Sequence, residues 1–231
     1  PHRRRAGDLG AQVNAYRKIR DFHGERAKGI GSSDLPILAG LTARYGSTPL
    51  RLWRQKTGRE APWSGNARTA WGHKLEGIVL REHVEGAHGP EAAETFFKNY
   101  LAGRSIGPFK VNTECRHPEH RYAIAHADLV YDPGDGGEAY IQEAKTSGAH
   151  ASRRGRDADY GYGSEDDGAE GIPAAVYLQV QWQLLVYGVR VAGVSLLRDT
   201  ADFREYGPIL PDLKVQEQAL ALAERFWWHI Q

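Results

Sequence analysis

The chain of 231 residues contains no methionine, one cysteine and no long apolar run. A single thiol, Cys115, excludes an internal disulfide framework and is typical of a reducing compartment. Without a long apolar run there is no transmembrane helix or secretory signal to expect, so the sequence predicts a soluble, cytoplasmic protein with no membrane partner. The absence of any methionine, including an initiator, indicates that the sequence is not the complete gene product.

Excess charge of either sign is also missing, since 30 basic residues balance 29 acidic ones. Nucleic-acid binding therefore cannot be inferred from net charge and would need local basic patches. There is no CxxC pattern or Cys/His cluster of the kind that holds structural zinc. The length and the 41% hydrophobic content predict a single domain over residues 1–231 with a real core.

The most informative stretch is Ala125–Ser147, which reads AHADLVYDPGDGGEAYIQEAKTS. Apolar runs on either side of a glycine-rich loop predict a hairpin with strands over 122–131 and 138–147. Side chains alternate along a strand, so Glu143 and Lys145 should share one face. The hairpin should therefore bring several charged side chains to one spot.

On this hairpin, Asp128 of the first strand can converge with Glu143 and Lys145 of the second, while Ala144 packs on the other face. Two carboxylates form a hard-oxygen site for Mg²⁺ or Mn²⁺. An adjacent lysine can orient a water or stabilise developing negative charge. The combination suits phosphodiester hydrolysis, although an acid-x-Lys triplet also occurs on ordinary solvated hairpins.

A further acid lies on a helix predicted over residues 67–86, and its predicted core stripe is Trp71, Leu75, Ile78 and Val79. Glu76 lies at the edge of this stripe, where it can be a site residue or a surface salt-bridge partner. Glycine inside a helix costs about 1 kcal/mol relative to alanine. Gly72 and Gly77 therefore indicate the close approach of another group.

Two other stretches carry polar groups with alternative interpretations. In GIGSSDLPILAGL, Ser32, Ser33 and Asp34 offer caps for a short helix ending near Ala39. Amides at this helix start, hydroxyls and a nearby arginine could instead cradle a phosphate. On the apolar helix predicted over 173–188, the glutamines at 179 and 183 share a face, and at least one should meet a polar site.

The remaining pattern is that of an α/β protein. Further helices are predicted over 9–22, 48–57 (with Leu50 and Trp53 buried) and 211–229, and further strands over Phe96-Phe97, Lys110–Cys115, 190–198 and 202–209. Residues 148–171, rich in Gly, Asp and Arg, predict a long mobile surface loop.

Four blocks of the sequence resemble, in order, the YqaJ-type viral recombinase family, which includes lambda exonuclease and belongs to the PD-(D/E)xK nuclease superfamily. They are GIGSSDLPILAGL with TPLRLWRQKTG, then WGHKLEGIVLREHVE, then HADLV with EAKTS, and finally YLQVQWQLLVYG. Ala127 precedes Asp128 where the superfamily label has proline, a common drift in this family. The resemblance covers residues 29–188 and implies a restriction-endonuclease-like core, a small mixed sheet flanked by helices with the hairpin central.

The resemblance also implies a role for each matching residue. Two Mg²⁺ or Mn²⁺ ions would be held by Asp128, Glu143, Glu76 and the carbonyl oxygen of Ala144. Lys145 would position the attacking water, and Gln179 would contact the nucleophile or the scissile phosphate. Arg26 and Ser33 would hold a terminal 5′-phosphate.

The function implied is that of a phage or bacterial exonuclease, which degrades linear duplex DNA 5′ to 3′ and exposes 3′ tails for recombination. A homotrimer and a single-strand annealing partner are implied in the same way. Two alternatives stay open at this point: a structure-specific endonuclease of the same superfamily, and a non-catalytic DNA-binding module with a nuclease fold.

Overall fold

The computed structural model describes residues 28–43, 46–147, 171–199 and 201–231. Predictions for the helix over 9–22, for Arg26 and for residues 148–170 of the loop lie outside this part of the chain. Within it, no helix combines the length and the apolar character needed to cross a membrane.

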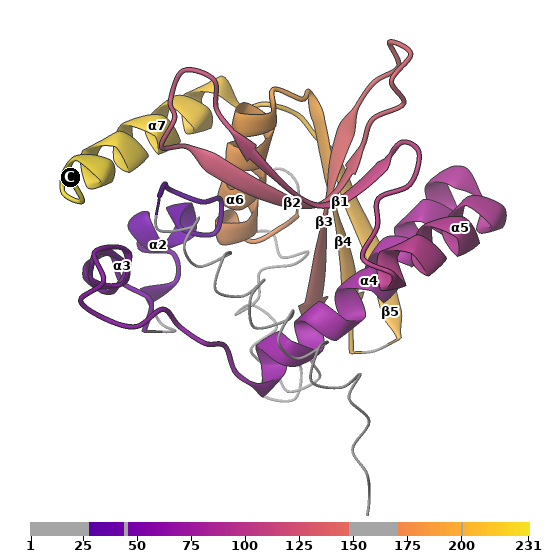
Figure 1. The fold of residues 1–231 in the computed structure, drawn as a ribbon, viewed down its shortest axis with the longest axis horizontal. Helices are drawn as coiled ribbons and strands as arrows, with labels where there is room; N and C mark the ends of the chain where they lie inside the picture. Colours follow the sequence, from indigo (N-terminus) through magenta and orange to yellow (C-terminus); the bar gives the residue numbers. More distant parts are fainter. Residues whose placement is uncertain (1–27, 44–45, 148–170, 200) are drawn as a thin grey trace, which may run out of the picture.

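The centre of the fold is one five-stranded mixed sheet in the order β1-β2-β3-β4-β5 (Figure 1). Strands β3 and β4 pair in parallel, and all other neighbours are antiparallel. The strands are β1 (Phe109–Arg116), β2 (Ile124–Tyr131), β3 (Tyr140–Ser147), β4 (Val191–Arg198) and β5 (Asp202–Ile209). The predicted mixed sheet, its hairpin and its two last strands are thus confirmed, and β3 of the hairpin is the middle strand.

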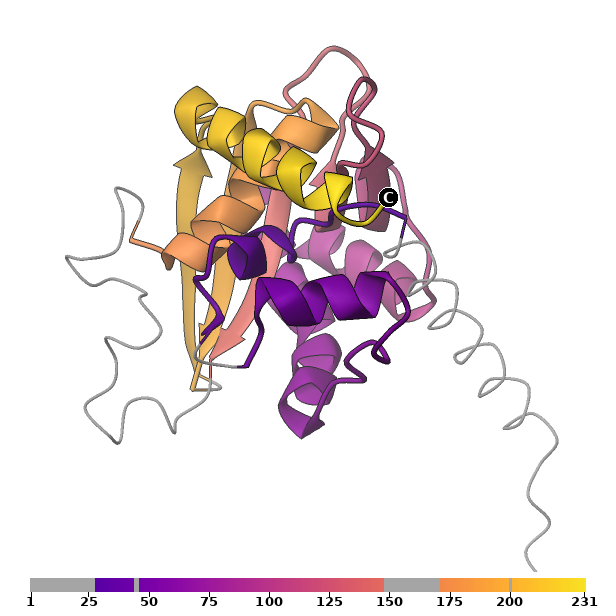
Figure 2. The ribbon, with the colours of Figure 1, turned by 90° about the vertical axis from the view of Figure 1, so that its left-hand side faces the viewer.

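Helices cover both faces of the sheet. They are α2 (Leu35–Leu38), α3 (Pro49–Lys56), α4 (Ala67–His88), α5 (Pro90–Leu101), α6 (Ala174–Tyr187) and α7 (Leu213–Trp228). Helix α6 packs on one face together with α2 and α7, while α4 and α5 pack against the other (Figures 1 and 2). The buried Trp182 joins α6 to β2, because its Nε1 donates to the carbonyl oxygen of Ile124 at 2.9 Å.

Three details of the helices differ from the sequence prediction. The Phe96-Phe97 pair belongs to α5 and not to a strand, because Ala93, Phe96 and Tyr100 recur at helical spacing and pack together on the sheet. Trp71 and Ile78 are 60% and 45% exposed. The buried part of α4 lies further along, from Gly77 to Val84, where the helix meets the sheet and α5. In α3 the buried residue is Leu52, while Leu50 is exposed.

The N-terminal blocks are joined by a buried ion pair. Lys56 Nζ lies 2.7 Å from Asp34 Oδ2, with side chains 5% and 1% exposed, and also donates to the carbonyl oxygen of Gly29. Asp34 makes no side-chain cap to α2 and accepts the amide of Gly31 instead. At Gly29 a Cβ would meet the carbonyl oxygen of Tyr122, so glycine is needed where this segment bridges to the start of β2.

Removing the lysine of this pair should strongly destabilise the fold. We expect Lys56→Ala to lower the free energy of unfolding by about 3–5 kcal/mol, because it removes the ammonium group that pairs with the buried Asp34 carboxylate. Chemical denaturation measures the change. Lys110→Ala is the matched control, since Lys110 pairs with Asp132 on the exposed surface and should cost at most about 1 kcal/mol. Equal losses in the two variants would contradict a structural role for the buried pair.

Candidate active site

The two strands of the central hairpin separate at Asp128. Pairing between β2 and β3 runs from Tyr131–Tyr140 to Leu129–Gln142 and goes no further. Beyond this point the Asp128 side chain replaces the backbone pairing, because its Oδ2 accepts a hydrogen bond from the backbone amide of Ala144 at 2.8 Å. The aspartate therefore lies in the opening between the strands, next to the second acid of the hairpin.

In β2, the alternation of side chains between the two faces of the sheet also breaks at Asp128. Ala127 packs on the α6 face of the sheet, and Leu129 packs against α4 and α5. In β1 the same change occurs between Val111 and Cys115. Asn112 lies between them, opposite Asp128, with a φ of 48° that asparagine tolerates better than most residues. This irregularity in β1 and β2 coincides with the position of the acid.

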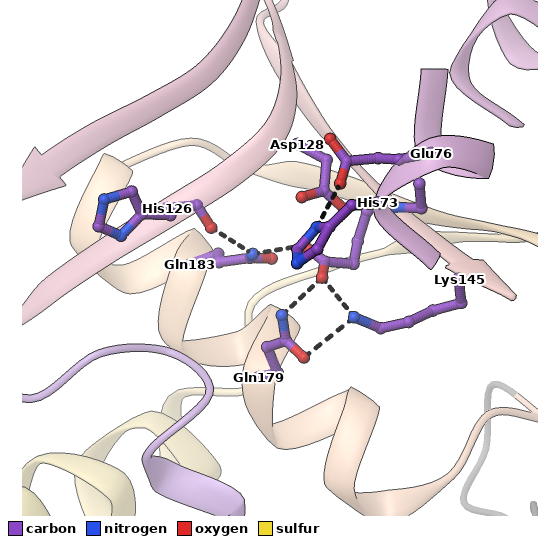
Figure 3. Close-up of polar contacts among 9 residues, drawn as sticks. His73, Glu76, His126, Asp128, Lys145, Gln179 and Gln183 are labelled. Carbon is purple, nitrogen blue, oxygen red and sulfur yellow. Dashed lines mark hydrogen bonds and ion pairs between the residues drawn. The ribbon is translucent and has the colours of Figure 1, made fainter. Parts of the chain in front are cut away.

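Glu143 is the centre of a hydrogen-bonded group on the α6 face, and its donors Lys145, Gln179 and Gln183 are labelled in Figure 3. It is 3% exposed. Lys145 Nζ donates to its Oε1, as does Gln179 Nε2 at 2.6 Å. Gln183 Nε2 donates to its Oε2 at 2.6 Å and to the carbonyl oxygen of His126 at 2.8 Å. Both carboxylate oxygens are thus held by donors.

Lys145 is oriented by the same group. Its Nζ also donates to Gln179 Oε1 at 3.2 Å, and its side chain is 26% exposed. Glu143 and Lys145 therefore share one face of β3, as predicted, and Ala144 packs against α4 and α5 on the other. The lysine beside this buried carboxylate also reaches solvent, which is where a substrate would approach.

Glu76 approaches from α4 on the other side of Asp128 (Figure 3). Its side chain is 15% exposed, and His73 Nδ1 lies 3.7 Å from its Oε2. Tyr100 of α5 donates its hydroxyl to Oε1 at 2.9 Å. Burial and the nearby Glu76 carboxylate raise the pKa of Tyr100, so its hydroxyl stays protonated and acts as a donor.

The three acids influence one another electrostatically. Burial, followed by the charges of Glu143 and Glu76, raises the pKa of Asp128 well above its ordinary value. Burial also raises the pKa of Glu76, with Glu143 adding to the effect, while the Tyr100 hydrogen bond and His73 oppose it. Such a group of like charges is unfavourable unless protons or a cation compensate it.

The donor set fits a hard divalent cation in its chemistry. Carboxylate oxygens of Glu76, Asp128 and Glu143, with the carbonyl oxygen of Ala144, are the ligand types that Mg²⁺ and Mn²⁺ take. In the described part of the chain, the side chains as they stand form no group of three or more His, Cys, Asp or Glu placed to hold an ion. Glu143 would have to exchange some of its present donors to become a ligand.

The structure thus brings five of the predicted site residues together: Glu76, Asp128, Glu143, Lys145 and Gln179. Ser33 is an exposed residue just before the start of α2, and Arg26 falls outside the described residues.

Two residues beside this group were not predicted as site residues. Gln183 shares a helical face with Gln179, and at least one of the two was expected to meet a polar site, but only Gln179 was given a role. Tyr100 could not have been found, because Phe96-Phe97 was predicted as a strand and no helix was predicted around Tyr100. Gln181, between the two glutamines, faces α7 and binds the backbone of Leu210 and Asp212.

Comparison with solved structures defines the class of fold. Two structures of the alkaline exonuclease LHK-Exo from Laribacter hongkongensis, one of them in complex with dAMP, match with TM-scores of 0.58 and 0.60, 14% and 13% identity, and coverage of 91% of this chain and 92% of theirs. A phage-related exonuclease from Haemophilus somnus 129PT matches with a TM-score of 0.53 and 14% identity, over 86% of this chain and 93% of its own. The fold is that of the PD-(D/E)xK-type exonucleases.

Sequence comparison then defines the family. Residues 21–190 match the profile of the YqaJ-like viral recombinase domain. The protein YqaJ of Bacillus subtilis (strain 168) is 30% identical over 165 residues, which are 71% of this chain and 41% of that protein. The chain therefore belongs to the YqaJ-like viral recombinase family, and it spans less than half the length of this relative.

Proposed function

We propose that the protein is a metal-dependent deoxyribonuclease that degrades linear double-stranded DNA from the 5′ end and leaves 3′ single-stranded tails for recombination. The observation that carries the proposal is the convergence of Glu76, Asp128 and Glu143 with Lys145 and Gln179 in the opening of the central hairpin. A DNA-binding module would gain nothing from buried acids that repel both one another and a phosphate backbone. A hydrolytic site needs them to hold a cation.

In this proposal each residue has a distinct task. Asp128, Glu143, Glu76 and the carbonyl oxygen of Ala144 hold Mg²⁺ or Mn²⁺, with two ions per site. The metal supplies Lewis acidity and an activated water. Lys145 donates to the water or to the phosphate oxygens as negative charge develops there. Gln179 hydrogen-bonds to both Glu143 and Lys145, so it holds the Glu143 carboxylate and the Lys145 ammonium group in one arrangement.

The 5′ end would be recognised at the N-terminal block. Ser33 is exposed beside the start of α2, while the Gly31 amide already donates a hydrogen bond to Asp34 Oδ2. The phosphate site would therefore rest on the Ser33 hydroxyl and on the guanidinium of Arg26, which can form a two-pronged contact with a terminal phosphate. A terminal phosphate carries more charge than an internal diester, so such a site prefers a phosphorylated end.

Digestion of matched substrates tests the proposal. We expect Mg²⁺-dependent loss of linear duplex, no loss of closed circular duplex, and faster digestion of a 5′-phosphorylated end than of a 5′-hydroxyl end. Arg26→Ala should reduce that difference more than it slows the hydroxyl-ended substrate. Cleavage of the closed circle would favour a structure-specific endonuclease, and binding without cleavage would favour a non-catalytic module. Digestion from the 3′ end would contradict only the proposed 5′-to-3′ direction.

A homotrimer and a single-strand annealing partner belong to the same proposal, and their support is the family resemblance of the sequence. A trimer would let the DNA pass through a ring and so keep the enzyme on its substrate. Light scattering on the purified chain measures the oligomeric state directly.

A further inference from the structure

Tyr100 contacts the acid on α4 from a neighbouring helix. After the single residue Gly89, α5 folds back along α4, and the two helices lie side by side (Figure 1). This arrangement places the Tyr100 hydroxyl 2.9 Å from Glu76 Oε1. The ring of Tyr100 packs within the cluster formed by α4, α5 and the sheet. The tyrosine is thus held by its ring and reaches the carboxylate with its hydroxyl.

Gly77 makes this contact possible. A Cβ at residue 77 would overlap the Tyr100 ring atoms Cε1 and Cδ1. Glycine inside a helix is unfavourable relative to alanine, so a buried glycine beside an acid has a reason to be there. Here the reason is the passage of the Tyr100 ring across α4. By contrast, a Cβ at Gly86 on the same helix would have no neighbouring atom within 4 Å.

The two oxygens of Glu76 are used differently. Tyr100 takes Oε1, while Oε2 faces His73 at 3.7 Å, beyond hydrogen-bond distance. The Asn112 side chain lies near enough to the Tyr100 hydroxyl to oppose the rise in its pKa. Asn112 lies opposite Asp128, at the irregular point of β1. Tyr100 therefore lies between the part of the sheet that carries Asp128 and the helix that carries Glu76.

We propose that Tyr100 is a positioning residue of the site: its hydroxyl holds Glu76 Oε1, so that Oε2 remains for a divalent cation next to Asp128. Gly77 is the position that admits the Tyr100 ring. The inference rests on the proposed function, because a cation is what Glu76 would serve. Residues that hydrogen-bond to metal ligands typically contribute on the order of 10- to 100-fold in metal affinity or activity.

Tyr100→Phe isolates the hydroxyl, because it keeps the ring over Gly77. We expect the Mg²⁺ and Mn²⁺ concentrations for half-maximal hydrolysis to rise about 10- to 100-fold, with the rate at saturating metal close to wild type. The midpoint of metal-induced thermal stabilisation should rise by the same factor, a readout that does not need activity. Tyr122→Phe is the matched control, since the Tyr122 hydroxyl is buried without a hydrogen-bond partner among the described residues. It should leave both midpoints unchanged.

Two further comparisons show whether the effect passes through Glu76. Gly77→Ala should displace the Tyr100 ring and shift the metal midpoint like Tyr100→Phe, while Gly86→Ala should not. In a Glu76→Gln background, Tyr100→Phe should add no further shift in metal-induced stabilisation.

The possible failures are separable. An unchanged midpoint in Tyr100→Phe, or an equal shift with and without the Glu76 carboxylate, would overturn the positioning role while leaving the nuclease proposal in place. A wild-type protein that neither hydrolyses DNA nor responds to metal would overturn both.

Discussion

Lys145→Ala is expected to remove DNA hydrolysis while leaving duplex binding nearly unchanged. The ammonium group is held by Glu143 and Gln179 at the exposed edge of the site. Its contribution grows as negative charge develops on the reacting oxygens, so its loss raises the activation free energy of hydrolysis without weakening DNA binding. Removing one such group slows the chemical step on the order of 10²- to 10³-fold or more.

Single-turnover cleavage and duplex binding, both measured at saturating metal, separate the two effects. Lys110→Ala is the control, because Lys110 is paired with Asp132 on the exposed surface and should cleave at the wild-type rate. If Lys145→Ala cleaves at near wild-type rate, the lysine has been assigned the wrong role. If binding falls as far as cleavage, Lys145 acts on the ground state of the complex.

The second large effect concerns Asp128 and the metal. The wild-type protein should gain thermal stability in Mg²⁺ or Mn²⁺ by mass action, by about 2.7 kcal/mol when free metal is 100 times its dissociation constant. Asp128→Asn should weaken this gain and abolish hydrolysis. Without metal, the variant should be at least as stable as wild type, because burial and two neighbouring acids make the Asp128 charge unfavourable.

The asparagine keeps the shape of the side chain, and its carbonyl oxygen can still accept the Ala144 amide. The experiment is a set of melting curves with chelator and with increasing metal. Asp132→Asn, further along the same hairpin, removes an exposed carboxylate and should leave the metal response intact. A melting curve of the wild-type protein that is indifferent to millimolar Mg²⁺ and Mn²⁺ would contradict the metal site.

Local signals were sufficient for much of the fold. Alternation and the glycine-rich loop predicted both strands of the hairpin, and the helix predicted over 48–57 is observed as α3, which Thr48 caps. Side-chain alternation also placed Glu143 and Lys145 on one face of β3, because this geometry depends on adjacent residues alone.

Local signals failed where packing decides between alternatives. The aromatic pair Phe96-Phe97 favours a strand by propensity, but Ala93, Phe96 and Tyr100 form one face of a helix that the sheet buries. Trp71 fits a core stripe by period, yet it is 60% exposed because α4 meets the sheet only further along. Periodicity reports which residues share a face and does not report where a neighbouring element begins.

The sequence by itself determined the residue types of the candidate site and the strand and helix that carry most of them, since these follow from short-range patterns. Only the tertiary structure decided that β2 and β3 separate at Asp128, that Gln183 joins Gln179 on Glu143, and that Tyr100 reaches Glu76 past Gly77. The glycine indicated a close approach without identifying its partner. Contacts between residues far apart in the chain depend on how whole elements pack, and no local pattern of residues carries that information.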